Sequence, residues 1–342
     1  MTTAHNPPHL SASNAAAPAK RGLFWIAGDK ILTPFGTAMR GPLFVEWESP
    51  EVVTQPFPLI LIHGGGGQGT DWLMTPDGRP GWASEFVQAG FAVYVVDRPG
   101  HGRSPHHPDV LGPVAPPFPF ELAQAYFAPP GPDAEAHTQW PWGRDFGDPE
   151  MAQAYSAMGF FMADLAESQE LDGDRLAQLL DLTGPAVLVS HSAGAPGGWL
   201  AANKRPELVR AIVAVEPMGP PFAEFPGLGP LAYGLTFATL RTEPPLNSPS
   251  ELQDNPSGFS VPGLTGTPIQ VVTGGVSPTA PGGAETVKFL TAIGAEAELV
   301  HLPDRGIEGN GHGLIFEKNS SETVKPVISW IAALDAGSDS QR

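Results

Sequence analysis

Short, uninterrupted apolar runs recur along the chain, each bounded by glycine, proline or polar residues. A run without polar alternation is typical of a strand that is buried on both faces of a parallel sheet. Segments with helical spacing of apolar residues separate these runs, so the pattern predicts an α/β fold with a doubly wound, mostly parallel sheet. The predicted strands are Phe57–Ile62, Phe91–Asp97, Ala186–Val189, Ala211–Val215, Ile269–Thr273 and Leu299–Leu302.

Between the first two of these runs, Trp82, Phe86 and Val87 share one helical face, and Gly90 supplies a C-terminal stop. Strand, helix and strand in close succession predict a parallel crossover connection. Asp174 is expected to cap the helix that leads into the strand at 186–189. Further elements expected from the same rules are two leading strands at Gly22–Leu32 and Pro42–Glu48, and helices at Trp199–Lys204, Ala284–Ile293 and around Val324–Ile331.

Two stretches, at about 105–170 and 218–267, lose this regularity and are interpreted as cap insertions, rich in proline and aromatic residues, on the sheet. Residues 105–161 hold ten aromatic side chains, so we expect this insertion either to pack as a cap or to line a substrate pocket. Residues 21–336 are expected to form a single domain that carries both insertions. The segments 1–20 and 337–342 are predicted to be disordered tails.

Charge and cysteine content narrow the possible partners. The chain has 342 residues, no cysteine and a formal net charge of −18, and this acidic balance opposes binding to nucleic acid or to an anionic membrane surface. Without cysteine there is neither a disulfide nor a thiolate metal site. The N-terminus lacks the pattern of a secretory signal, and no apolar run is long enough to span a bilayer. We therefore expect a cytoplasmic protein that acts on a small molecule without a cofactor, and a homodimer remains possible.

The stretch AVLVSHSAG at 186–194 joins an apolar strand to a tight turn that carries one serine between small residues. Ser190-His191-Ser192-Ala193-Gly194 matches the nucleophile elbow G-x-S-x-G, except that Ser190 replaces the first glycine. Small residues are needed there because the strand and the following helix approach each other closely. The pattern predicts that Ser192 is a catalytic nucleophile.

A serine hydroxyl needs a base to accept its proton, and a carboxylate usually orients that base. His312 lies in a glycine-rich turn between the last strand and the last helix, where doubly wound hydrolases carry their histidine. The turn after 269–273, where the acid is most often found, has no carboxylate. Glu216, at the end of the strand 211–215, is therefore the preferred acid, and Asp304 is the alternative.

The negative charge that develops on the substrate oxygen requires backbone N–H donors. Ala193 supplies one of them by the geometry of the elbow. The turn His63-Gly64-Gly65-Gly66-Gly67 is similar to the HGGG-type motif of esterases and lipases. We expect the second donor to be Gly65, with Gly66 as the alternative.

Longer stretches resemble the α/β-hydrolase superfamily, and within it a bacterial esterase family similar to esterase 713. They are TDW and TPDGRPGW within 70–82, YVVDRPGHGRS at 94–104, VSHS, VEP and GIEGNGH. The resemblance extends over about residues 22–335 and is weakest in the two insertions. In that family the acid is a glutamate after the sixth strand, so the resemblance implies Ser192, Glu216 and His312 as the catalytic triad.

These observations predict a serine carboxylesterase that cleaves small or medium uncharged esters through an acyl-enzyme. An acyltransferase that uses the same residues remains open. The segment Gly64–Gly69 also satisfies G-x-G-x-x-G after a strand, and Asp97 ends the next strand, as in a dinucleotide-binding oxidoreductase. Pro76 and Gly78 interrupt the helix that this alternative requires.

Two further alternatives concern the lack of catalysis and a metal site. A non-catalytic binding protein could share the same fold, because fold alone does not establish activity. His106, His107 and Asp109 are close in sequence, as metal ligands often are. Their proline-rich surroundings and the lack of downstream ligands predict a solvent-exposed loop without a metal.

Overall fold

The computed structural model describes residues 19–225 and 228–336, and its centre is an eight-stranded sheet. The strands are β1 (Ala19–Ile26), β4 (Leu43–Pro50), β5 (Leu59–Ile62), β6 (Val93–Asp97), β7 (Ala186–His191), β8 (Val209–Val215), β11 (Pro268–Thr273) and β12 (Glu296–His301). Their order across the sheet is β1-β4-β6-β5-β7-β8-β11-β12. Strand β4 pairs antiparallel with both β1 and β6, and all the other neighbours are parallel. The predicted α/β fold with a mostly parallel sheet is confirmed.

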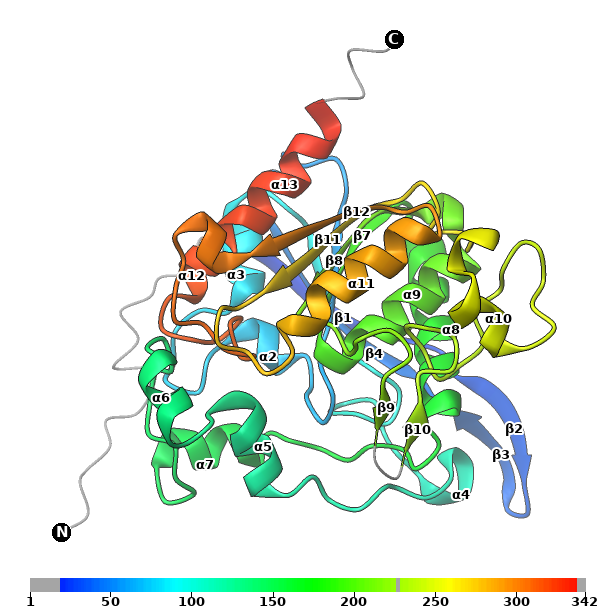
Figure 1. Cartoon of the computed structure of the whole chain (residues 1–342). Coiled ribbons are helices and arrows are strands. Elements are labelled where there is room, and N and C mark those ends of the chain that lie inside the picture. The colour runs from blue at the N-terminus through cyan, green and yellow to red at the C-terminus, as the bar shows by residue number, and fades with distance from the viewer. Residues whose placement is uncertain (1–18, 226–227, 337–342) are drawn as a thin grey trace.

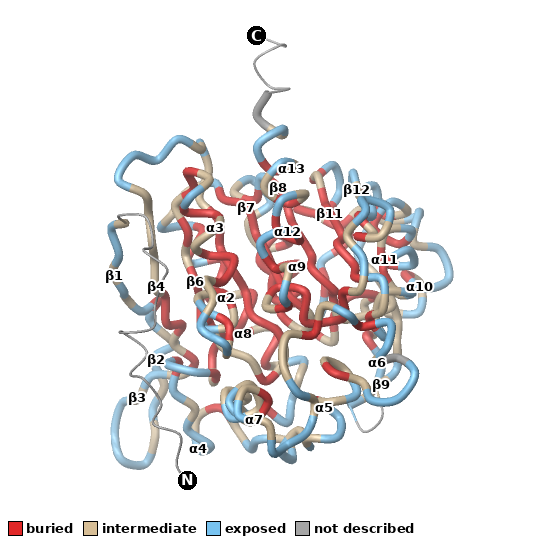
Figure 2. The backbone as a smooth tube through the Cα atoms, turned by 90° about the vertical axis from the view of Figure 1, so that its left-hand side faces the viewer, coloured by how far each residue is buried: buried red, intermediate tan, exposed pale blue. Residues whose placement is uncertain are grey.

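The two faces of the sheet bury separate apolar cores, because successive side chains of a strand point to opposite faces. In β5, Ile60 and Ile62 belong to one core, whereas Leu59 and Leu61 belong to the other. Three helices pack on the first face and two on the second. Figure 1 shows helices on both sides of the sheet, and Figure 2 shows the buried centre between them. The three helices are α8 (Leu165–Thr183), α9 (Ala195–Lys204) and α11 (Pro281–Ala292), and the two are α3 (Trp82–Gln88) and α13 (Lys325–Ala336).

The N-terminal part differs from the expected pair of strands. Strand β1 already includes residues 19 and 20, which were predicted to belong to a tail, whereas 1–18 and 337–342 lie outside the described residues. The predicted strand Gly22–Leu32 is interrupted at Gly28, and β2 (Asp29–Thr33) and β3 (Gly36–Arg40) then form a separate hairpin. A Cβ atom on Gly28 would lie 2.2 Å from the carbonyl oxygen of Arg40, so the hairpin can close only over a glycine.

Helix α8 begins earlier than expected. Its N-cap is Asp164, whose carboxylate accepts a hydrogen bond of 2.9 Å from the N–H of Glu167. The prediction that Asp174 caps this helix was wrong, because Asp174 lies within α8 and pairs with Lys204 of α9 at 2.9 Å. The first half of α8 buries mainly polar and small side chains, so apolar periodicity could not reveal it. The first insertion therefore ends before residue 165, not near 170.

The first insertion carries four short helices, α4 (Pro108–Leu111), α5 (Phe120–Phe127), α6 (Pro132–Ala136) and α7 (Pro149–Ser156). Figure 1 shows α5, α6 and α7 grouped together beyond one end of the sheet. Their aromatic residues form a small core of their own around Trp140 and Met151, and Phe316 packs against it. This insertion is the cap.

The second insertion, 218–267, contains β9 (Glu224–Phe225), β10 (Gly229–Pro230) and α10 (Pro249–Asp254). Its buried residues, including Leu235, Leu252 and Val261, join the core beneath α8, α9 and α11. It thickens that layer and is not part of the cap. Within 19–225 and 228–336, no helix is both long and apolar enough to cross a bilayer.

Candidate active site

Ser192 stands at the sharp turn between β7 and α9. Its φ angle is 52°, a left-handed conformation that costs a non-glycine residue about 1 to 2 kcal/mol. Gly194 has to be a glycine, because a Cβ atom there would lie 2.3 Å from the carbonyl oxygen of His63. Ser190 is buried, and its hydroxyl donates to the carbonyl oxygen of Val213 at 3.4 Å. A serine is therefore accommodated at the first position of the motif.

His312 reaches Ser192 from the loop after β12. Its Nε2 atom lies 2.9 Å from the Oγ atom of Ser192, and its carbonyl oxygen lies 2.9 Å from Nε2 of His191. Burial, and then the neighbouring His312, lower the pKa of His191 to about 3. His191 is therefore neutral, and its Nε2–H donates to the carbonyl oxygen of His312, which holds that residue beside Ser192.

Glu216 lies behind His312, and a threonine hydroxyl stands between the two. The Nδ1 atom of His312 is 3.4 Å from Oε2 of Glu216 but 3.0 Å from Oγ1 of Thr279. The hydroxyl of Thr279 also donates to Oε2 of Glu216. The Nδ1–H of His312 can therefore reach the carboxylate both directly and through Thr279.

The turn after β11 holds the carboxylate of Glu216 in place. The N–H of Gly274 donates to Oε1 at 2.5 Å, and the Ser277 hydroxyl donates to Oε2 at 2.5 Å, alongside Thr279. This turn has no carboxylate of its own and instead contributes donors to the acid of the neighbouring strand. Sequence reasoning missed Ser277 and Thr279, for which the only signal was two hydroxyl residues where an acid is usual. Asp304, the alternative acid, is exposed in the turn after β12.

Gly65 and Ala193 approach each other beside the nucleophile. A Cβ atom on Gly65 would lie 3.2 Å from that of Ala193 and 2.7 Å from the ring of Phe161. In the described part of the chain we find no acceptor for the N–H of Gly65. Gly66 has a φ angle of 65°, and its carbonyl oxygen accepts a hydrogen bond of 2.5 Å from Gly159 of the cap. The turn thus leaves the N–H of Gly65 without an acceptor near Ser192 and is tied to the cap through the carbonyl oxygen of Gly66.

Comparisons with known proteins identify the family of this chain. A family model described as the alpha/beta hydrolase fold matches residues 58–240. The chain belongs to this family. A protein named probable secreted lipase phiG, from Fungal sp. (strain ATCC 74256), is 36% identical over 312 residues, which cover 84% of this chain and 85% of that protein. The α/β-hydrolase superfamily predicted from the motifs is confirmed.

A solved structure also resembles this α/β-hydrolase. It is described as the atomic resolution structure of a novel bacterial esterase, and the two superimpose with a TM-score of 0.68 at 24% identity. The match covers 93% of this chain and 98% of that chain. The fold is thus shared over almost the whole length of both chains.

A buried polar network supports the oxyanion turn of this α/β-hydrolase. The carbonyl oxygen of Gly64 accepts hydrogen bonds from Nη2 of Arg98 at 3.0 Å and from Nδ1 of His63 at 2.9 Å. Arg98 also pairs with Asp172 of α8 at 2.7 Å. Burial, and then Arg98, lower the pKa of His63 well below its usual value. The neutral ring can accept the N–H of Arg98 on Nε2, at 3.0 Å, which fixes its tautomer and the position of the turn.

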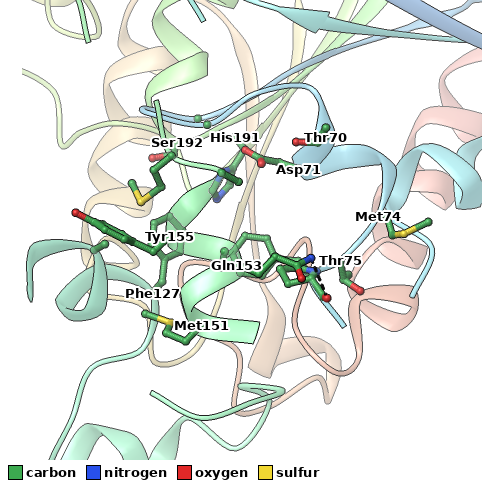
Figure 3. Close-up of a pocket in the computed structure, with 18 of the residues that line it drawn as sticks. Thr70, Asp71, Met74, Thr75, Phe127, Met151, Gln153, Tyr155, His191 and Ser192 are labelled. Atoms are coloured by element: carbon green, nitrogen blue, oxygen red, sulfur yellow. Dashed lines mark hydrogen bonds between the residues drawn. The ribbon is translucent and has the colours of Figure 1, made fainter. Parts of the chain in front are cut away.

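A pocket of about 420 Å³ opens beside Ser192 (Figure 3). The cap and the segment that follows the oxyanion turn, including α2 (Thr70–Leu73), provide most of its wall. The lining is largely aromatic and methionine-rich, with Phe127, Trp140, Met151, Tyr155, Met158 and Phe316. The cap therefore both packs and lines a pocket, although the sequence suggested these as alternatives.

The features that suggested other functions have structural roles. The glycine-rich turn leads into α2, a helix of four residues, where a dinucleotide fold needs a long one. The carboxylate of Asp97 accepts hydrogen bonds from the N–H of Gly69 at 2.6 Å and from Arg103 at 2.7 Å, so it anchors the turn. His107 and Asp109 are exposed and 3.9 Å apart, and the described ranges contain no group of three or more side chains placed to hold a metal ion.

Proposed function

We propose that this α/β-hydrolase is a serine carboxylesterase with Ser192 as nucleophile, His312 as base and Glu216 as the orienting acid. The observation that carries the proposal is the 2.9 Å contact between His312 Nε2 and Ser192 Oγ, with Gly65 and Ala193 beside it. In this geometry the imidazole can accept the hydroxyl proton while Oγ attacks the ester carbonyl carbon.

The proposed reaction has two halves. In the first, a bond forms between Ser192 Oγ and the carbonyl carbon, and the N–H groups of Gly65 and Ala193 stabilise the negative oxygen. The ester C–O bond then breaks, and the alcohol leaves with the proton from His312. In the second half, His312 removes a proton from water, which attacks the acyl-enzyme and releases the acid. Glu216 and Thr279 hold the imidazole and stabilise its charged form.

The proposed substrates are small or medium esters. A pocket of about 420 Å³ with a largely apolar wall suits a short or medium acyl chain, because burial of CH₂ groups contributes about 0.8 kcal/mol each. We also propose a cytoplasmic location and leave a homodimer open. Cell fractionation tests the location, which the name of the secreted fungal relative makes worth measuring, and sedimentation velocity tests the dimer.

Covalent labelling with a fluorophosphonate, followed by intact-mass measurement, tests the mechanism together with hydrolysis of p-nitrophenyl butyrate. We expect one adduct on Ser192 and a loss of at least about 10³ in kcat for Ser192→Ala. Ser156→Ala, at an exposed serine of α7, is the control and should label and hydrolyse like the parent. Hydrolysis by Ser192→Ala at the parent rate would refute the proposal.

A further inference from the structure

One carboxyl group in the pocket has no part in the reaction described above. Asp71 belongs to α2 and lines the pocket, and Figure 3 shows its side chain directed from α2 toward the side where Ser192 and His191 lie. It lies against the oxyanion turn, since a Cβ atom on Gly67 would be 2.2 Å from its Oδ2. A ligand on the nucleophile would therefore lie within reach of this carboxyl group.

Asp71 is half-buried and weakly partnered for a carboxyl group in an apolar pocket. Its Oδ2 accepts one long hydrogen bond, of 3.3 Å, from the N–H of Gln68. Within the parts of the chain that the structure describes, we find no donor to Oδ1 and no cation at ion-pair distance. Burial raises the pKa of Asp71 to about 7, because a carboxylate removed from water lacks the solvation that stabilises its charge. A positive group supplied by a ligand would relieve this cost.

The surroundings of Asp71 also favour a cation. Phe127, Trp140 and Tyr155 present aromatic rings to the same pocket, and ring faces attract alkylammonium groups. The net charge of −18 draws cations toward the protein and repels anions. Both effects act in the same direction as the carboxylate.

We propose that Asp71 binds the positively charged nitrogen of amino- or ammonium-bearing esters, and so selects them over uncharged esters of the same shape. This inference rests on the proposed esterase function and names a substrate class for it. Uncharged esters still fit the apolar wall, but they leave the carboxylate without a partner. Asp71 is thus a specificity-determining residue, and the chemistry at Ser192 does not require it.

The test compares matched pairs of esters that differ only in charge. One pair is 2-(trimethylammonio)ethyl acetate and 3,3-dimethylbutyl acetate, and a second pair places the same groups in the acyl chain. At pH 8.5 we expect kcat/KM for the charged member to exceed that of its isostere by at least about tenfold in one pair. Asp71→Asn, which keeps an acceptor for Gln68, should bring the ratio to about one. Glu121→Gln, at an exposed acid of α5, removes the same charge outside the pocket and should keep the parent ratio.

The ratio should also depend on pH, which provides a measurement on the unmodified enzyme. Asp71 is protonated below pH 7 and ionised above it, so the preference should rise as pH increases through about 7. The titratable groups around it are Asp97 and Arg98 behind the turn, His191 and Tyr155 in the pocket wall, and His312 against Ser192. Any effect of pH on the step at Ser192 itself acts on both members of a pair, and therefore cancels in the ratio.

The possible outcomes separate this inference from the proposed function. Equal kcat/KM within both pairs at every pH, with Ser192-dependent hydrolysis intact, would overturn the role of Asp71 and leave the esterase. An unchanged preference in Asp71→Asn would do the same. Absence of hydrolysis of all four esters and of fluorophosphonate labelling would reject the esterase itself. If Asp71→Asn fails to fold, the pH dependence of the parent ratio decides alone.

Discussion

At the residue scale, the backbone at Ser192 and Glu216 directs both side chains to the same edge of the sheet. Each residue directly follows a strand, β7 or β8, and each has a left-handed φ angle, 52° for Ser192 and 48° for Glu216. The two strands are parallel neighbours, so their carboxyl ends lie side by side. Such strain, of about 1 to 3 kcal/mol for each residue, persists only where the surrounding structure stabilises it.

Replacing the acid tests which carboxylate orients His312. We expect Glu216→Gln to lower kcat by about 10³ to 10⁴, because the neutral amide no longer stabilises the imidazolium or fixes its tautomer. Asp304→Asn should change kcat less than about twofold, since Asp304 is exposed. Both variants are to be measured on one ester, with thermal melts to verify folding. If Asp304→Asn lost most of its kcat while Glu216→Gln kept the parent value, the orienting acid would be Asp304, in the loop after β12.

A second prediction at the residue scale concerns the hydroxyl group of Thr279. If it connects His312 to Glu216, Thr279→Val should lower kcat by about tenfold, because one hydrogen bond to a charged group is lost. The acidic limb of the pH–rate profile should also shift, while KM changes little. Thr279→Ser keeps the hydroxyl and should restore both the rate and the profile. A valine variant with the parent profile would mean that Glu216 acts on His312 directly.

At the element scale, a buried carboxylate joins the cap to the loop that carries His312. Glu317 Oε1 is 2.7 Å from Nε2 of His137 in the cap and accepts the N–H of Gly311 at 2.9 Å. Its Oε2 accepts the amide of Asn310 at 2.7 Å. The side chains of His137 and Glu317 are fully buried. The position of the cap and that of His312 are therefore coupled through one side chain.

Removal of this carboxylate should affect both stability and rate. We expect Glu317→Ala to lower the free energy of unfolding by about 3 kcal/mol, because it leaves buried donors unsatisfied. The value of kcat should fall as well, because Glu317 holds the N–H of Gly311, the residue directly before His312. Chemical denaturation and ester kinetics measure the two effects, and Glu322→Ala, an exposed pair with Lys325, serves as the control. Unchanged kinetics in a folded variant would contradict the coupling.

Another prediction at this scale concerns the contact between α8 and α9. This contact matters because α9 begins just after Ser192. A Cβ atom on Gly197 would lie 2.9 Å from Cβ of Asp172, so the two helices approach over a glycine. Gly197→Val should destabilise the fold by about 1 to 3 kcal/mol through overpacking. Gly184→Val, where the added Cβ meets nothing within 4 Å but φ is 74°, separates packing from backbone strain. If Gly197→Val left the free energy of unfolding unchanged, the two helices could move apart at this contact without cost.

At the scale of the whole molecule, the excess of acidic residues acts against the compact state. The chain has 36 Asp and Glu residues against 18 Lys and Arg residues, so the excess negative charges on the surface repel one another at neutral pH. Raising NaCl from about 0.01 M to 0.3 M shortens the Debye length from about 30 Å to less than 10 Å. We expect the melting temperature to rise by about 2 °C or more, whereas kcat/KM for ammonium esters should fall. A melting temperature that decreases with salt would show that attractive ion pairs dominate.

The sequence by itself determined the sheet, the nucleophile turn and the candidates for base and acid. These features depend on local patterns: an apolar run predicts a buried strand, and small residues around Ser192 predict a sharp turn. The predicted strands from 57 to 302 correspond to β5, β6, β7, β8, β11 and β12 within a few residues. The structure also brings Ser192, His312 and Glu216 together, although their catalytic roles stay proposals until measured.

The tertiary structure decided the features that depend on contacts between distant segments. Thr279 lies 33 residues from His312 and 63 from Glu216 along the chain, so its position between them has no local signal. The early start of α8 and the interruption at Gly28 follow from packing against α9 and Arg40. In the sequence Asp71 is only one residue of the matching TDW motif, and its place in the pocket wall appears only in the folded chain. The physical reason is common to all of them: burial, pKa and hydrogen bonding depend on which groups surround a side chain, and only the folded chain brings those groups together.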